Sequence, residues 1–192
     1  MGQPKAWLPF GDELMLQRVV RVVKEAVDSV MVVAAPDQDI PKLPDGVLLV
    51  RDDLEGRGPM QGLVSGLKAL KDRVDRVYLS SCDVPFLRVA FVQRILSMLA
   101  AFTPIACKKI AIPNVGGRFH PLAAAYSITV LPQVQQLLDA NRLRLLDLID
   151  LLPTQIIEGH ELAGVDPEFE SLRNINTREE YESALQDLRT RQ

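Results

Sequence analysis

The stretch Arg76-Val77-Tyr78-Leu79-Ser80-Ser81-Cys82-Asp83-Val84-Pro85 indicates the fold. Its first seven residues are mostly apolar or small and predict a strand, and the proline stops that strand. In open α/β sheets, ligands bind outside the carboxyl ends of the strands, which is where Asp83 would lie. Composition alone explains Asp83 equally well as a strand-ending or helix-capping residue, so the chemical interpretation needs support from other segments.

Strands and helices alternate on both sides of this stretch. Short β-branched runs at 30–35 and 47–50 predict strands covered on both faces, and helical spacing of apolar residues returns between Pro59 and Leu70. Regular alternation predicts an α/β fold with a parallel sheet. Further helices are expected at 12–27, with Gly11-Asp12 as N-cap, and at 89–101, 129–139, 143–151 and 178–191; further strands are expected near 105–111, 121–127 and 155–157.

Length and composition indicate one globular domain over residues 1–192. The chain is 47% hydrophobic and 24% charged, with a net charge of −3. This balance argues against a sequence-independent nucleic-acid binder, which needs an excess of Lys and Arg. Apolar runs are too short to span a bilayer, and Cys82 and Cys107 are too few for a disulfide framework or a zinc site. We therefore expect a cytoplasmic protein with no membrane and no nucleic-acid partner.

Two other segments could bind phosphate groups. In Asp52-Asp53-Leu54-Glu55-Gly56-Arg57-Gly58-Pro59-Met60-Gln61-Gly62, carboxylates are followed by a glycine-rich loop that leads into a helix. Such a loop allows close approach of a ligand, and the start of the helix supplies free N–H groups, although a purely structural turn is the simpler alternative. In Met1-Gly2-Gln3-Pro4-Lys5-Ala6-Trp7-Leu8-Pro9-Phe10-Gly11, the lysine would by default be an ordinary surface residue.

Together the three segments resemble the molybdenum-cofactor guanylyltransferase family of nucleotidyltransferases. Residues 1–11 match the second half of its signature L-A-G-G-x-S-x-R-M-G-x-x-K-A-x-L-P-F-G, residues 58–62 loosely match G-P-L-A-G, and residues 82–87 match C-D-x-P-F-L in full. Residues 117–122 resemble the family's G-x-x-H-P-L, with His120, and residues 174–180 resemble its N-I-N-T-x-E-E/D. The last segment is also a capping box, so it supports membership more than catalysis.

The resemblance implies a Rossmann-like, three-layer α/β/α sandwich with a mostly parallel sheet. It implies transfer of GMP from GTP to molybdopterin with release of pyrophosphate, Mg²⁺ as cofactor, and a molybdenum-insertion protein as a further partner. Asp83 would bind Mg²⁺, and Lys5 and Asp83 would be catalytic. Asp52, Gly58 and Pro59 would join them in binding the nucleotide, with Asp53 as the alternative to Asp52.

The sequence departs from the family pattern at two places. The first half of the signature, with a strand from the middle of the sheet, does not precede Met1, and the loss of such a strand would leave backbone groups of two neighbours unpaired. We expect a start codon assigned too late or a truncated copy, and weak or no activity if translation begins at Met1. Ala34-Ala35-Pro36 stands where some members carry a guanine-contacting asparagine. Alternatives are therefore a transferase that uses CTP or a sugar phosphate, and a non-catalytic paralogue that binds a molybdenum-biosynthesis partner.

Overall fold

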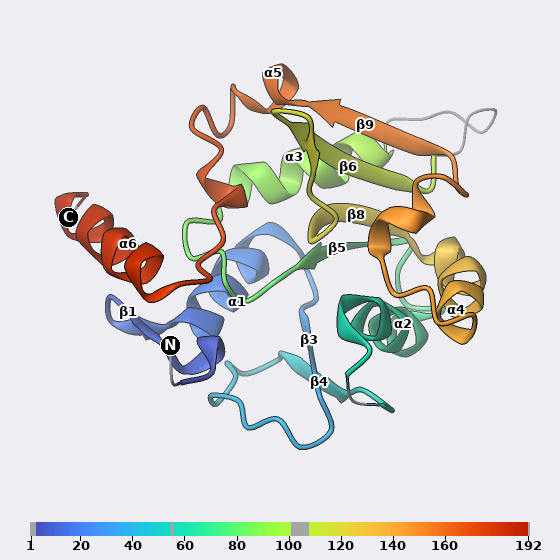
Figure 1. Cartoon of the computed structure of the whole chain (residues 1–192), viewed down its shortest axis with the longest axis horizontal. Coiled ribbons are helices and arrows are strands. Elements are labelled where there is room, and N and C mark those ends of the chain that lie inside the picture. Colours follow the sequence, from blue (N-terminus) through green and yellow to red (C-terminus); the bar gives the residue numbers. More distant parts are fainter. Residues whose placement is uncertain (1–2, 55, 101–107, 192) are drawn as a thin grey trace.

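Strands and helices alternate in the computed structural model, which describes residues 3–54, 56–100 and 108–191 (Figure 1). The helices are α1 (Met15–Ala26), α2 (Gly58–Leu70), α3 (Val89–Ala100), α4 (Leu131–Asp139), α5 (Gly159–Leu162) and α6 (Arg178–Thr190). Short 3-10 turns are η1 (Lys5–Trp7), η3 (Ile128–Val130), η4 (Leu145–Leu148) and η5 (Glu170–Leu172). The strands are β1 (Pro9–Phe10), β2 (Glu13–Leu14), β3 (Met31–Ala34), β4 (Leu48–Arg51), β5 (Arg76–Ser80), β6 (Ile110–Val115), β7 (Arg118–Phe119), β8 (Ala123–Ser127) and β9 (Thr154–Glu158).

The strand pairings are mixed, which differs from the mostly parallel sheet expected from the sequence. β3 pairs with β4 in parallel, and β6 pairs with β9 in parallel. β8 lies between β5 and β6 and is antiparallel to both. Only seven residues separate β6 from β8, from 116 to 122, and a parallel crossover needs a dozen or more, so the chain must return antiparallel.

Helices cover both faces of β6 and β8, so the α/β class and the expected three layers are confirmed. The expectation that the run at 47–50 is covered on both faces is wrong, because Leu48 and Leu49 in β4 are 38% and 43% exposed. Alternate residues of β6 and β8 enter two separate cores. Ala111 and Ala125 face the core formed with α1 and α3, whereas Ile112 and Tyr126 face the core formed with α2 and α4. This alternation is the period of two expected of a strand buried on both faces.

The pairing is interrupted between β3 and β5. In the described part of the chain, β3 and β4 form one two-stranded sheet and β5 belongs to another, with β8, β6, β7 and β9. Figure 1 shows β3 and β4 below β5, which leads into the larger sheet.

Three predicted elements differ from the structure. The helix expected from residue 12 begins at Met15, because Phe10 pairs with Glu13 across a turn in which Gly11 has φ +65°. The helix expected at 143–151 is only the 3-10 turn η4. The strand expected near 105–111 begins at Ile110 and continues to Val115, while Cys107 lies outside the described residues.

Candidate active site

Asp83 lies just beyond the carboxyl end of β5, as the sequence predicts. β5 ends at Ser80, and Asp83 is only 8% exposed although it is charged. A carboxylate in such a position must find hydrogen-bond donors, because an unpaired buried charge is costly. Asp83 finds them on two segments remote in sequence.

Both carboxylate oxygens of Asp83 accept hydrogen bonds. Oδ2 accepts from Lys5 Nζ at 2.7 Å, which forms an ion pair, and Oδ1 accepts from Ser81 Oγ at 2.6 Å and from Asn174 Nδ2 at 2.8 Å. Lys5 Nζ also donates to Asn176 Oδ1 at 2.7 Å. The start of the chain, the end of β5 and the segment before α6 therefore converge on one carboxylate.

This setting keeps Asp83 ionised. Burial raises the pKa of its carboxyl, but the hydrogen bonds from Lys5, Ser81 and Asn174 outweigh burial and hold the pKa below its ordinary value. For the adjacent Cys82 thiol, burial and the negative charge of Asp83 raise the pKa, so the thiol stays protonated. The site thus offers a fixed carboxylate paired with a partly exposed lysine rather than a thiolate nucleophile.

Oδ2 and Oδ1 are held differently, and this bears on metal binding. The donors to Oδ1 come from short side chains fixed by their backbones, whereas the Lys5 side chain is 31% exposed and can move away from Oδ2. Within the described residues, no group of three or more His, Cys, Asp or Glu side chains could hold a metal ion. A cation at Asp83 would therefore need most of its ligands from elsewhere, and Mg²⁺ commonly takes one or two carboxylates plus substrate phosphates.

The second predicted segment connects β4 to α2. Asp52 follows β4 and is half-buried, and its backbone N–H donates to the carbonyl of Ala34 at 2.8 Å. Its Oδ1 is buried without a hydrogen-bond partner in the described part of the chain. Burial raises the pKa of the Asp52 carboxyl, a hydrogen bond from Ser65 opposes this, and the negative charge of Asp53 adds to it. Asp52 therefore offers a buried acceptor that a ligand could satisfy, whereas Asp53 is exposed.

Gly58 begins α2 and Pro59 follows it in the first turn. Gly58 has φ +60°, and a Cβ built on it would meet no atom within 4 Å. Its conformation suits glycine, and the space around it is open to a ligand near the helix start. Of the predicted site residues, Lys5 and Asp83 are in contact with each other. Asp52 and Gly58 lie on a different segment, the one that connects β4 to α2. Pro59 shares a cavity of about 370 Å³ with Ser81 and Cys82.

Another cavity, of about 330 Å³, is lined in part by Asp83 itself. Polar side chains at its wall come from the β6–β7–β8 region and from the segment before α6, and they include Arg118, His120, Asn174 and Asn176. Burial and the charge of Arg118 both lower the pKa of His120, so its imidazole is neutral near pH 7. The cavity therefore combines neutral hydrogen-bonding groups with the Arg118 guanidinium and the Asp83 carboxylate.

Sequence reasoning missed most of these partners. Asn174 and Asn176 stand in the segment interpreted as a capping box, which the structure confirms: Thr177 Oγ1 accepts from the Glu180 N–H at 3.1 Å. The two asparagines just before this capping box, Asn174 and Asn176, were the sequence signal that could have identified the partners of Asp83 and Lys5.

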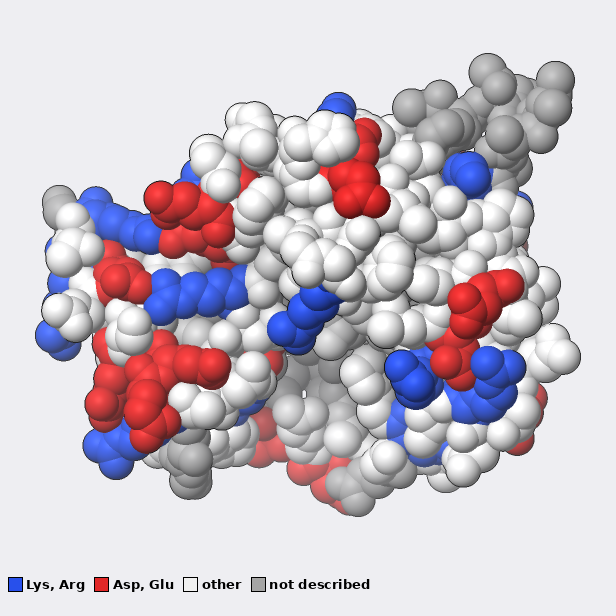
Figure 2. Space-filling view, turned by 45° about the horizontal axis from the view of Figure 1, so that its top comes forward, with Lys and Arg blue, Asp and Glu red and all other residues white. Residues whose placement is uncertain are grey.

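On the face drawn in Figure 2, acidic and basic side chains are interspersed, most densely at the left where α6 lies. Within the described residues, no helix is both long and apolar enough to cross a membrane.

Comparison with known sequences identifies relatives along nearly the whole chain. The family described as the MobA-like NTP transferase domain matches residues 1–151. A molybdenum cofactor guanylyltransferase of Desulfosudis oleivorans is 28% identical over 183 residues, covering 95% of this chain and 86% of that protein. A probable molybdenum cofactor guanylyltransferase of Mycobacterium bovis is 32% identical over 153 residues, covering 78% and 73%.

Known structures share the fold. Molybdopterin-guanine dinucleotide biosynthesis protein A from Archaeoglobus fulgidus has a TM-score of 0.77 at 16% identity, covering 98% of this chain and 92% of that chain. The 2-C-methyl-D-erythritol 4-phosphate cytidylyltransferase from Thermus thermophilus has a TM-score of 0.70 at 18% identity, covering 98% and 95%. At these identities the likeness concerns the fold, and the Rossmann-like transferase architecture expected from the sequence is confirmed.

Proposed function

The chain belongs to the MobA-like NTP transferase family, and from this premise we propose that it transfers GMP from GTP to molybdopterin. The observation that carries the proposal is the Lys5–Asp83 pair at the carboxyl end of β5, in a chain whose relatives are named molybdenum cofactor guanylyltransferases. The reaction joins GMP to the terminal phosphate of the pterin and releases pyrophosphate.

In the proposed reaction, an oxygen of the pterin phosphate attacks the α-phosphorus of GTP. A new P–O bond forms while the bond from the α-phosphorus to the oxygen bridging to the β-phosphate breaks, and that oxygen leaves with the electron pair as part of pyrophosphate. Negative charge builds on the leaving group. Lys5 Nζ can turn from Asp83 toward the phosphates and offset this charge, because its side chain is partly exposed.

Asp83 fits the role of a Mg²⁺ ligand. Movement of Lys5 exposes Oδ2, while Ser81 and Asn174 keep the carboxylate oriented through Oδ1. A bound Mg²⁺ would neutralise charge on the phosphate oxygens. The depressed pKa of Asp83 keeps the carboxylate available as a ligand at neutral pH.

For the nucleotide, we assign the β4–α2 segment. The Oδ1 of Asp52, which has no hydrogen-bond partner among the described residues, can accept a hydrogen bond from the nucleoside. The first turn of α2, which begins at Gly58, offers the positive end of the helix dipole and backbone N–H groups, except at Pro59, whose ring has no N–H. The chain has Ala34-Ala35-Pro36 at the end of β3, so guanine selectivity must come from other groups. Preference for GTP over CTP and UTP is therefore tested separately from phosphate binding.

For the acceptor, we assign the 330 Å³ cavity beside Asp83. Arg118 supplies positive charge for a phosphate, and the neutral His120 and the two asparagines supply hydrogen bonds. Asp83 lines this cavity, so a phosphate bound there would lie next to the carboxylate.

The test is pyrophosphate release in the presence of GTP, Mg²⁺ and molybdopterin, with CTP and UTP compared at equal concentration. Asp83→Asn keeps the size of the side chain and should lower the rate by at least about 100-fold. Asp147→Asn is the matched control. Asp147 lies on η4, where its Oδ2 forms an ion pair with Arg142 Nε at 2.9 Å, and it has no role in the proposed chemistry. Equal rates for the two variants would refute the role of Asp83. Nucleotide binding without pyrophosphate release in the unmodified chain would favour a non-catalytic paralogue.

A further inference from the structure

Two polar side chains of α2 are buried without a role in the site described above. Gln61 is 3% exposed and Ser65 is 6% exposed. The other buried polar side chains of the described residues lie at Asp83 or in the ion-pair cluster around Glu170. Burial of a side-chain amide or hydroxyl is unfavourable unless the group is hydrogen-bonded, so the contacts of this pair show what it does.

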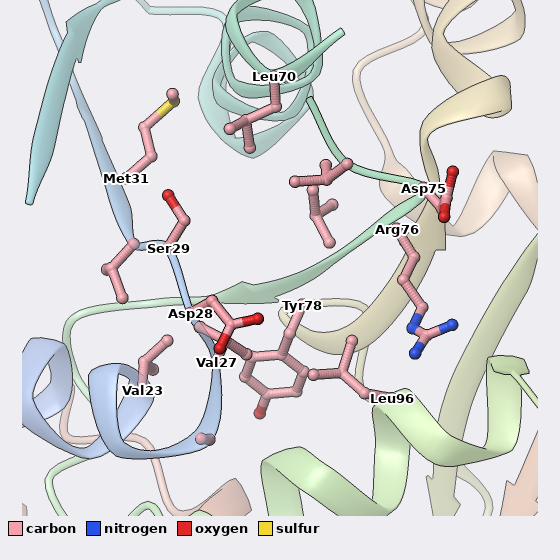
Figure 3. Close-up of a pocket in the computed structure, with 14 residues that line it drawn as sticks. Val23, Val27, Asp28, Ser29, Met31, Leu70, Asp75, Arg76, Tyr78 and Leu96 are labelled. Atoms are coloured by element: carbon pink, nitrogen blue, oxygen red, sulfur yellow. The ribbon is translucent and has the colours of Figure 1, made fainter. Parts of the chain in front are cut away.

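The position of Ser65 on α2 turns its side chain away from β3. A Cβ built on Gly66 would lie 3.6 Å from a side chain of β3, and Figure 3 shows Leu70 of α2 and Met31 of β3 pointing into one cavity. Gly66 and Leu70 therefore mark the face of α2 that lies on β3. Ser65 precedes Gly66, so its side chain is rotated by about 100° around the helix from that face.

A chain of hydrogen bonds leads from Gln61 through Ser65 to Asp52, which follows β4. Gln61 Nε2 donates to Ser65 Oγ at 3.2 Å, one helical turn away. The Ser65 hydroxyl donates to the Asp52 carboxylate, and this bond lowers the pKa of Asp52 against the effect of burial. A serine hydroxyl has a single hydrogen to donate, so accepting a bond from Gln61 favours the orientation in which that hydrogen points to Asp52.

Asp52 is thereby held through both its backbone and its side chain. Its backbone N–H donates to the carbonyl of Ala34 at 2.8 Å, which fixes the residue beside the end of β3. The bond from Ser65 restricts the side chain, while Oδ1 is buried and has no hydrogen-bond partner among the described residues. An acceptor that is already oriented binds a ligand with less loss of conformational entropy than a freely rotating one.

We propose that Ser65 and Gln61 are positioning residues for nucleotide binding, which hold the carboxylate of Asp52 so that its Oδ1 meets the nucleoside. This inference rests on the proposed function, which assigns Asp52 to the nucleoside. Ser65 acts directly on Asp52, and Gln61 acts through Ser65. Loss of Ser65 should therefore have the larger effect.

Calorimetry of GTP binding with Mg²⁺, without the acceptor, is the first test. Ser65→Ala should raise the Kd for GTP by about 3- to 10-fold and Gln61→Leu by about 2-fold, the range of a single hydrogen bond. Ser65→Thr retains the hydroxyl and should restore most of the affinity. Gln61→Leu should unfold at or above the temperature of the wild type, because leucine is a good helix former and removes a buried amide.

Two control variants remove similar groups from other helices. Ser97→Ala removes a hydroxyl that donates to the carbonyl of Arg94 on α3 at 2.7 Å. Gln135→Leu removes an amide that donates to Asp139 on α4 at 2.7 Å, also one helical turn away. Both controls should bind GTP as the wild type does.

A carbon-13 NMR titration of the Asp52 carboxyl, without nucleotide, is the second test, and Asp52→Asn identifies the resonance. The bond from Ser65 stabilises the ionised carboxylate, so Ser65→Ala should move the titration midpoint to higher pH. Gln61→Leu should move it in the same direction by less. The charge of Asp53, which also raises the pKa of Asp52, is the same in every variant.

Two results would overturn the proposal. One is an Asp52 midpoint that is the same in Ser65→Ala as in the wild type. The other is a changed ratio of GTP to CTP affinity in Gln61→Leu with an unchanged Asp52 midpoint, because Gln61 would then contact the base itself. Failure of the transferase function looks different: the variants would change GTP affinity and the midpoint as expected, but the unmodified chain would release no pyrophosphate.

Discussion

We expect the side chains of Lys5 and Asp83 to contribute a coupling free energy of about 1 to 2 kcal/mol to folding at pH 7. A double-mutant cycle with Lys5→Met and Asp83→Asn measures it. The atoms Nζ and Oδ2 are 2.7 Å apart, and the side chains are 31% and 12% exposed. Exposed ion pairs contribute about 0.2 to 1 kcal/mol, and hydrogen bonds to charged groups about 1.5 to 3 kcal/mol. Asp83 keeps two other donors when Lys5 is lost, which places the coupling between these ranges.

Urea unfolding of the four proteins measures this coupling, and Arg142 with Asp147 provides the control cycle. In that pair Nε lies 2.9 Å from Oδ2, but the side chains are 50% and 19% exposed. We expect a coupling of at most about 0.5 kcal/mol there, because solvent screens the exposed guanidinium. A Lys5–Asp83 coupling no larger than that of the control would refute the interpretation of a partly buried, strongly hydrogen-bonded pair.

The pH dependence follows from the pKa of Asp83. Folding lowers this pKa below its ordinary value of 3.8, so the ionised carboxylate stabilises the fold above pH 3.8. This stabilisation is lost as the pH falls through the folded-state pKa. The coupling should therefore be constant from pH 7 to 5 and shrink below pH 3.8. A coupling that persists where the wild-type carboxyl is protonated would contradict an ionic origin.

Three further outcomes are expected. Lys5→Ala should raise the KM for GTP by about 10- to 100-fold, as loss of a charged contact to phosphate implies, and unchanged steady-state kinetics would refute its role. Gly58→Ala should lower the free energy of unfolding by about 1 kcal/mol because φ is +60°, and the control Gly46→Ala, at φ +82°, should lower it by a similar amount. Only Gly58→Ala should weaken GTP binding, as measured by calorimetry. Glu170→Gln should destabilise the fold by about 1 to 2 kcal/mol at pH 7. Hydrogen bonds from Arg191 and Arg88 lower the pKa of Glu170 to about 2. The stability difference between wild type and Glu170→Gln should therefore shrink as the pH falls from 4.5 toward 2. A stability difference that stays constant over this range in unfolding curves would exclude the ionic explanation.

The sequence predicted features that depend on local pattern. β5 is a run of apolar residues stopped by a proline, so its carboxyl end and the position of Asp83 could be read directly. The β-branched runs of β3 and β4 and the helical spacing of α2 were equally local. Each of these signals lies within about a dozen residues, and the structure reproduces them within one or two positions.

Features that depend on tertiary packing could not be predicted in this way. Residues 143–151 have enough apolar side chains for a helix, but only Leu145 and Leu148 are buried, and the segment forms a single 3-10 turn between Asn141 and Pro153. So short a segment gains little from α-helical hydrogen bonds alone. By contrast, the antiparallel direction of β8 follows from the short connection after β6, which the expectation of a mostly parallel sheet did not take into account.

The partners of Asp83 show the same limit at the site itself. Asn174 is 91 residues away and Lys5 is 78 residues away, so neither contact leaves a trace in local periodicity. The backbone makes the arrangement specific: the Ile175 N–H donates to the Asp83 carbonyl at 2.9 Å, which fixes the segment before α6 against the end of β5. Because this bond and the two side-chain contacts join three remote segments, the carboxylate is oriented only when the amino-terminal turn and the segment before α6 are both in place. The geometry of the site therefore depends on the complete fold, whereas its central residue, Asp83, could be identified from the six-residue segment 82–87 alone.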